Sequence, residues 1–90
     1  NDLYKIYVGY KRSDSNSSET KDLLDANEYL GYVTGFSDAS DGSVFCPGKL
    51  VTRGQIASVV GKYLENNPEV RDMSAQLLLF KSLSSAFPCK

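Results

Sequence analysis

Few residues in this sequence could perform catalysis. There is no histidine among its 90 residues, which excludes nucleophile activation by Ser-His-Asp or Cys-His arrangements and every metal site with histidine ligands. Two cysteines cannot complete a four-ligand zinc site by themselves. A nucleophilic Cys46 would need a nearby lysine or a helix N-terminus to form its thiolate. We therefore predict that the chain is not an enzyme and binds no metal ion and no cofactor.

The carboxylates form neither a calcium-binding motif nor a catalytic acid–base pair. If Gly42 stood at the sixth position of a calcium-binding EF-hand loop, three ligand positions would hold residues without a carboxylate, namely Ser37, Ala39 and Gly48. We interpret Asp41-Gly42 as a turn instead. Three further carboxylates follow one another at helical spacing, but an exposed helix face would leave them solvated rather than tuned for proton transfer: Asp22, Asp25 and Glu28.

The composition is that of one small globular domain. A chain of 90 residues and 9.9 kDa is too short for two independent hydrophobic cores. Lys and Arg number 10 and Asp and Glu number 11, so the net charge of −1 argues against a general nucleic-acid-binding protein. No stretch approaches the roughly eighteen apolar residues that a membrane span requires. We therefore expect residues 1–90 to form a single domain that binds no nucleic acid and does not insert into a membrane.

The two cysteines predict a disulfide bond. Cys46 follows a loop rich in Gly and Ser, and Cys89 is the second-to-last residue, so neither is placed like a core thiol within a helix. A bridge between them would stabilise the fold by about 4 kcal/mol and would indicate an oxidising compartment. Two reduced surface thiols are the alternative. The chain begins at Asn1 without an initiator Met, which is typical of a mature or trimmed form whose targeting signal has been removed.

Apolar residues recur at helical spacing nearly everywhere, which predicts an all-α fold, a small bundle of about four helices. The first helix is expected to end near Arg12, and its apolar stripe is Leu3, Ile6, Tyr7 and Tyr10. After a loop over Ser13–Ser18, a long second helix should extend to about Ser37, with Tyr29 and Phe36 beside a stripe of Leu23, Ala26, Leu30 and Val33. Gly31 and Gly35 within it each cost about 1 kcal/mol relative to Ala. We therefore expect another backbone to approach them closely, either in this chain or in a second copy.

Two loops and two helices complete the prediction. Glycine and proline make Asp38–Leu50 the main loop. Thr52 and Gln55 form a capping-box sequence that starts the third helix, and Pro68 stops this helix near Asn66. A connector over Asn66–Asp72 leads to the last helix, over about Met73–Ala86, which we expect to bury Leu79, Phe80, Leu83 and Phe87 or their neighbours.

Charge and aromatic residues point to surfaces rather than to catalysis. Residues 14–41 contain seven acidic residues and one basic residue, Lys21, which leaves a local net charge of −6. This acidic segment is either a solvated helix face or a surface that steers a basic partner. Most of the six Tyr and four Phe residues are expected in the core, but Tyr4 and Tyr32 lie off the apolar stripes and are candidate hot spots of a protein interface.

Five short blocks resemble the Rap/Tai-type immunity proteins of bacterial type VI secretion. In chain order they are Gly31-Tyr32-Val33-x-Gly35-Phe36-x-Asp38-Ala39, Phe45-Cys46-x-Gly48, Val51-Thr52-x-Gly54-Gln55, Val59-Val60-x-Lys62-Tyr63-Leu64-Glu65-x-Asn67-Pro68-Glu69 and Ala86-Phe87-Pro88-Cys89. The resemblance covers about residues 29–89. It implies a small periplasmic helical protein, a homodimer, that binds and blocks a secreted peptidoglycan amidase of the papain-like cysteine peptidase type. Members often carry a further cysteine pair where this sequence has Tyr7 and Tyr29, which suggests a packed aromatic pair in its place.

The resemblance also implies occlusion, in which a protruding loop enters the substrate cleft of the amidase. The connector offers a rigid tip with the candidate binding residues Asn67, Pro68, Glu69, Val70, Arg71 and Asp72, although a plain helix–helix link is the alternative. We expect Arg71→Ala with Glu69→Ala to weaken binding while leaving folding intact. The loop over Asp38–Ser43, tethered at Cys46, would set specificity through Asp38, Asp41 and Ser43. A periplasmic adaptor or structural domain that binds another protein or a peptide is the alternative function.

Overall fold

The computed structural model of the protein describes residues 2–13 and 19–89, and for Asp2 it describes the backbone alone. Its elements are α1 (Asp2–Arg12), α2 (Thr20–Ser40), α3 (Arg53–Asn66), the short 3₁₀ helix η1 (Pro68–Val70) and α4 (Ala75–Ala86). The described residues form no β-strand, so the predicted all-α fold of four helices is confirmed. None of these helices is long and apolar enough to cross a membrane. Asp14 and most of the loop expected over Ser13–Ser18 lie outside the described ranges.

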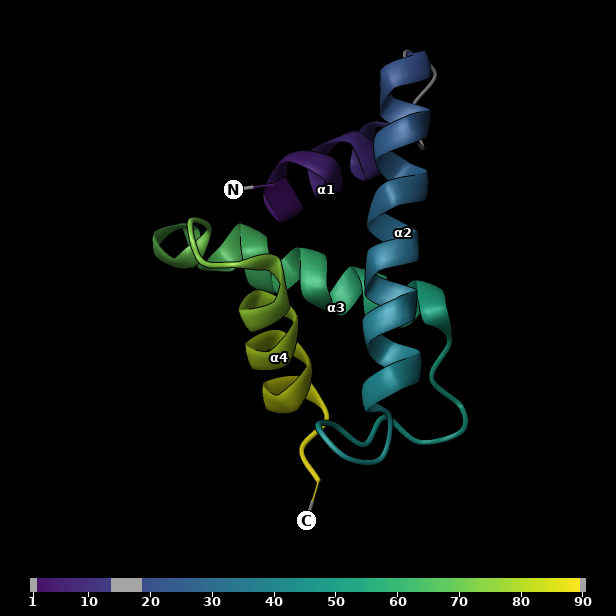
Figure 1. The fold of residues 1–90 in the computed structure, drawn as a ribbon, viewed down its shortest axis with the longest axis vertical. Coiled ribbons are helices and arrows are strands. Elements are labelled where there is room, and N and C mark those ends of the chain that lie inside the picture. The colour runs from purple at the N-terminus through teal and green to yellow at the C-terminus, as the bar shows by residue number, and fades with distance from the viewer. Residues whose placement is uncertain (1, 14–18, 90) are drawn as a thin grey trace.

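The long helix α2 crosses α3, and α1 and α4 lie on opposite sides of α3 (Figure 1). This arrangement brings apolar side chains from all four helices into one core. The largest fully buried ones are Leu3 of α1, Tyr29 and Val33 of α2, Phe45 of the following loop, Val60 and Leu64 of α3, and Leu78, Leu79 and Leu83 of α4. Burial of this shared apolar surface holds the helices together.

Local signals define the ends of α3 as predicted. The backbone N–H of Gln55 donates to Thr52 Oγ1 at 3.1 Å, and the N–H of Thr52 donates to Gln55 Oε1 at 2.7 Å, which is the expected capping box. The helix ends at Asn66, two residues before Pro68, because proline disfavours helical geometry in the residue before it. At the next helix, the Ser74 side chain accepts the N–H of Leu77 at 3.2 Å, so α4 begins at Ala75 rather than at Met73.

Two tyrosines join α1 and α2 to α3. The rings of Tyr7 and Tyr29 pack with their centroids 5.4 Å apart, so the expected aromatic pair is present. The Tyr29 hydroxyl donates to the carbonyl of Ala57 at 2.7 Å, and the Tyr7 hydroxyl donates to Glu65 Oε2 at 2.7 Å. Burial raises the pKa of both tyrosines above the ordinary value, so both hydroxyls stay protonated hydrogen-bond donors.

The close helix contacts use different glycines from those that the sequence suggested. A Cβ built on Gly31 or Gly35 meets no atom within 4 Å, so the expected approach of another backbone does not occur among the described residues of the chain. A Cβ on Gly61 would instead lie 2.2 Å from Tyr7 Cε1, and one on Gly9 would lie 2.4 Å from the Cβ of Asp25. The α1–α3 and α1–α2 crossings therefore depend on Gly61 and Gly9.

One predicted helix end differs in the structure, and two residues expected to be buried are exposed. Helix α2 continues to Ser40, because its backbone hydrogen bonds persist until the turn at Gly42, which has φ +86°. Asp38 is therefore helical and not part of a loop. Leu23 is 52% exposed and Phe80 is 47% exposed, because the buried faces pass through the neighbouring positions Asp22 and Leu79.

The predicted disulfide bond between Cys46 and Cys89 is present. It joins the loop after α2 to the end of the chain after α4, and the N–H of Cys46 donates to the carbonyl of Phe87 at 2.8 Å beside it. The buried ring of Phe45 packs against Phe87, with 6.3 Å between the ring centroids. Covalent, hydrogen-bonding and aromatic contacts thus hold this end of the bundle together.

Candidate partner-binding surface

The connector between α3 and α4 has a defined backbone. Pro68 opens the single turn η1, and the N–H groups of Val70 and Met73 donate to the carbonyls of Asn67 and Val70 at 3.1 and 3.0 Å. The Asn67 side chain donates to the carbonyl of Tyr63 at 2.9 Å, which satisfies an acceptor in the last turn of α3. The connector is therefore ordered by its own hydrogen bonds and by those to α3.

Arg71 fastens this connector to the rest of the protein. Its Nε donates to the carbonyl of Leu64 at 2.8 Å, and its terminal NH2 group donates to the carbonyl of Glu65 at 3.3 Å. The guanidinium also lies 3.9 Å from the ring centroid of Tyr4, a cation–π geometry. These contacts conflict with the expectation that Arg71→Ala would leave folding intact. The substitution removes the hydrogen-bond donors of two backbone carbonyls at the end of α3.

Glu65 completes the junction between α1 and α3. Its carboxylate accepts hydrogen bonds from Lys11 and from Tyr7, and these lower the pKa of Glu65 below its ordinary value. The side chains of Arg71 and Glu65, which support the connector, thus make their hydrogen bonds within the protein. Of the six candidate binding residues in the connector, Pro68, Glu69 and Asp72 are exposed to solvent, whereas Asn67, Val70 and Arg71 are half-buried.

The second predicted loop lies elsewhere. Asp41 and Ser43 are exposed at the turn that follows α2, and Asp38 lies on the last turn of α2 itself, with its carboxylate 3.6 Å from Arg53. Figure 1 places this turn at the far end of α2, close to the C-terminal end of the chain, and the connector at the end of α3. The two predicted binding segments do not form one continuous surface.

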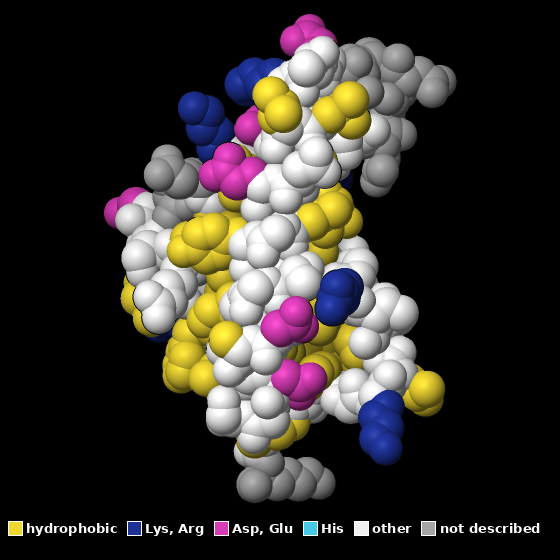
Figure 2. Space-filling view, turned by 45° about the vertical axis from the view of Figure 1, so that its right-hand side comes forward, with side chains coloured by type: hydrophobic (Ala, Val, Ile, Leu, Met, Phe, Trp, Pro, Cys, Tyr) yellow, Lys and Arg dark blue, Asp and Glu magenta, His cyan; other side chains and the backbone are white. Residues whose placement is uncertain are grey.

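The acidic segment is not a continuous acidic face. Asp22 is buried and accepts the N–H of Glu19 at 3.1 Å, and Asp25 lies 3.7 Å from Lys21. In the face shown in Figure 2, the acidic side chains are scattered over the molecule, some of them beside Lys or Arg side chains, rather than gathered in one patch. The expectation that Asp22 is a solvated surface carboxylate is wrong, because it caps the first turn of α2.

Within the described ranges, no three Cys, Asp or Glu side chains lie close enough together to hold a metal ion.

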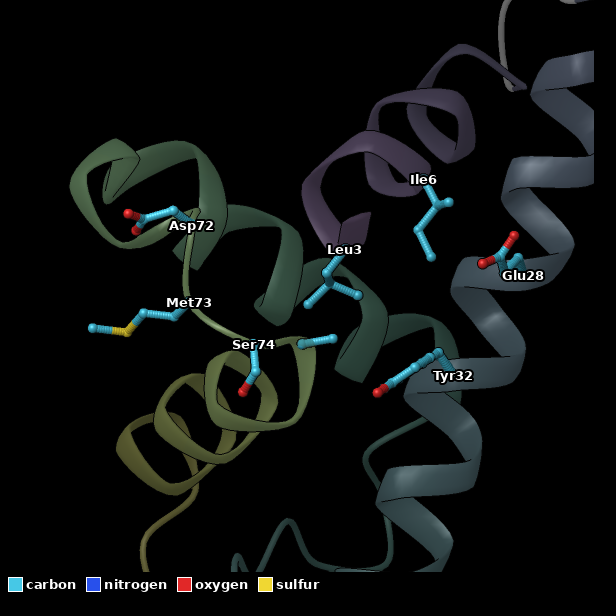
Figure 3. Close-up of a pocket in the computed structure, with 8 residues that line it drawn as sticks. Leu3, Ile6, Glu28, Tyr32, Asp72, Met73 and Ser74 are labelled. Atoms are coloured by element: carbon cyan, nitrogen blue, oxygen red, sulfur yellow. The ribbon is translucent and has the colours of Figure 1, made fainter. Parts of the chain in front are cut away.

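A groove that the sequence did not reveal lies beside the connector. It has a volume of about 500 Å³ and runs between α1, α2 and the start of α4, and its lining residues are Leu3, Ile6, Glu28, Tyr32, Asp72, Met73, Ser74 and Ala75. In Figure 3, Glu28 projects from α2 toward Ile6 of α1, and the Tyr32 ring projects across toward the start of α4. Tyr32 is 45% exposed, as expected for an aromatic residue off the apolar stripe. Its spacing of four residues from Glu28 could have placed the two on one face, but only the packing of α1 shows that this face borders a groove.

No curated protein matches the chain. The profile of one family, described as Rap1a immunity proteins, matches residues 1–89, which is nearly the whole chain and includes the α1 region that the sequence blocks left out. A short disulfide-bonded helical fold with exposed connecting segments agrees with the earlier resemblance. The chain therefore belongs to the Rap1a immunity protein family.

Proposed function

We propose that this immunity protein resides in the periplasm and protects its bacterium from a peptidoglycan amidase delivered by type VI secretion. Family membership makes the chain an immunity protein against a secreted toxin. The amidase as target, a papain-like cysteine peptidase that cuts the stem peptide of the cell wall, is our inference from the resemblance. The disulfide bond between Cys46 and Cys89 supports an oxidising compartment such as the periplasm.

The observation that carries the proposed mechanism is the connector. Its backbone is held by Asn67 and Arg71, while the side chains of Pro68, Glu69 and Asp72 are exposed. A segment that is already ordered loses little conformational entropy when it enters a partner's cleft. We infer that this connector occupies the substrate cleft of the amidase and excludes the peptide, and that the inhibitor itself performs no chemistry.

Two further parts of the proposal concern specificity and assembly. The turn with Asp41 and Ser43 would contact a second region of the toxin and distinguish the cognate amidase from its relatives. We also infer that the protein acts as a homodimer, as the resemblance implies. The open, exposed faces of Gly31 and Gly35 on α2 are available for such a contact between copies.

The test is complex formation with purified type VI amidases, followed by a peptidoglycan cleavage assay with and without the protein. We expect a stable complex and loss of cleavage. The variant Glu69→Ala/Asp72→Ala should weaken binding at least tenfold and keep the unfolding midpoint, whereas Lys81→Ala on α4 serves as a matched exposed control with unchanged affinity. Absence of binding to every amidase would contradict the proposed target and would favour an adaptor domain with another partner.

A further inference from the structure

We propose that the groove beside the connector is a pocket for a cationic side chain of the toxin, arginine in particular. The inference rests on the proposed function in one respect, namely that the connector contacts the toxin. The groove and the connector share Asp72, so a toxin that surrounds the connector would also cover the groove. The groove would then anchor the toxin beside the occluded cleft.

The charge of the groove selects a cation. Two of its lining residues are acidic, Glu28 and Asp72, and no lysine or arginine among the residues that the structure describes lines it. The ion pairs between described residues lie elsewhere, at Lys11–Glu65, Lys21–Asp25 and Arg53–Asp38. Figure 3 shows the Glu28 side chain directed toward the groove and that of Asp72 at its rim, directed away. Glu28 would therefore contact the cation, and Asp72 would add negative potential at the entrance.

The remaining walls suit a long side chain with an apolar stem. Leu3 and Ile6 form an apolar floor against which methylene groups can pack. The exposed ring of Tyr32 offers a face for a planar guanidinium. The protein already contains this kind of contact, since the guanidinium of Arg71 lies 3.9 Å from the ring centroid of Tyr4. Lysine lacks the planar group, which is why we favour arginine.

The groove is also large enough for its occupant. Its volume of about 500 Å³ lies within the usual range of small-ligand pockets, so it can hold one arginine side chain together with adjacent backbone. Tyrosine and arginine are both among the residue types enriched at interface hot spots. Glu28 and Tyr32 are on the solvent-facing side of α2, so substitution there should not disturb the core.

The first experiment needs no toxin. ¹⁵N-labelled protein is titrated with N-acetylargininamide at constant ionic strength, and with N-acetylcitrullinamide as the neutral isostere. We expect saturable shifts of the backbone amides of Glu28, Tyr32, Ser74 and Ala75, with half-saturation on the order of millimolar, and much smaller shifts with citrulline. Glu28→Gln should raise the Kd about threefold or more, and Asp41→Asn, the same chemical change at the far end of α2, should leave it unchanged. No saturable shift at these residues, or equal shifts with citrulline, would overturn the proposal.

The second experiment uses the toxin complex. Glu28→Gln and Tyr32→Ala should each weaken toxin binding about tenfold or more, with unchanged unfolding midpoints. If the toxin binds both variants as tightly as the native protein, the groove is not part of the interface and the proposal fails. If the arginine probe saturates the groove but no amidase binds the protein, the pocket stands and the proposed target fails. The two hypotheses are thus tested separately.

Discussion

Gly61→Ala should destabilise the protein, although alanine is the better helix former. The Cβ introduced on α3 would lie 2.2 Å from Tyr7 Cε1 and 2.6 Å from Cζ, whereas carbon atoms in contact are normally about 3.5–4 Å apart. The Tyr7 ring would have to move by more than 1 Å. It has little freedom to do so, because its ring packs on Tyr29 and its hydroxyl is bound to Glu65.

The expected magnitude follows from three contributions. Alanine improves the helix by about 1 kcal/mol relative to glycine. Overpacking of a filled contact costs about 1–3 kcal/mol, and displacement of the Tyr7 hydroxyl from the Glu65 carboxylate costs about another 1.5–3 kcal/mol. The net loss should be about 1.5–5 kcal/mol. For a domain of this size, a loss of about 2 kcal/mol lowers Tm by roughly 10 °C.

Gly35→Ala is the matched control. It makes the same change inside a helix, but its Cβ meets no atom within 4 Å, so the free energy of unfolding should rise by about 0.5–1 kcal/mol. Urea unfolding of both variants is followed by circular dichroism at low protein concentration. At a constant m value, the shift of each urea midpoint shows whether the substitution raises or lowers the free energy of unfolding. The packing argument is refuted if Gly61→Ala is as stable as the native protein, or if both substitutions destabilise it equally.

Three further predictions concern the contacts around the connector and the disulfide. Arg71→Ala should lower the free energy of unfolding by about 1–3 kcal/mol, because the last carbonyls of α3 lose their donors and Tyr4 loses its cation; an unchanged urea midpoint would show that these bonds contribute nothing. The pKa of Glu65 is lower in the folded protein than its ordinary value of 4.5, so its contribution to stability is present above about pH 4.5 and is lost as the pH falls through the lowered pKa. Urea midpoints measured from pH 6 to pH 3 should therefore fall more steeply for the native protein than for Glu65→Gln, and parallel curves would contradict this. Replacement of Cys46 and Cys89 by Ser should cost about 4 kcal/mol, and a reductant should destabilise the native protein to the same level while leaving the double variant unaffected in thermal unfolding.

Signals that act within one turn of the chain could be interpreted from the sequence. The Thr52 and Gln55 side chains cap α3 because their partners are backbone groups three residues away, and Pro68 ends the helix through a clash with its immediate neighbour. The all-α class and the Cys46–Cys89 disulfide were equally accessible, the first from periodicity and the second because no other cysteine exists. The connector was predicted as a binding segment because the family resemblance implies an occluding loop, and its role stays a prediction.

Only the tertiary structure decided which residues perform which task. The sequence shows glycines at 31, 35, 9 and 61 alike, but close packing is required only where another helix passes, at Gly9 and Gly61. Arg71 was predicted as a binding residue of the connector, and in the structure its length and planar group let it reach back to the end of α3 and to Tyr4. The groove between α1, α2 and α4 joins residues from separate parts of the chain. Sequence periodicity specifies which side of each helix is apolar, whereas the angles at which the helices cross determine what remains exposed between them.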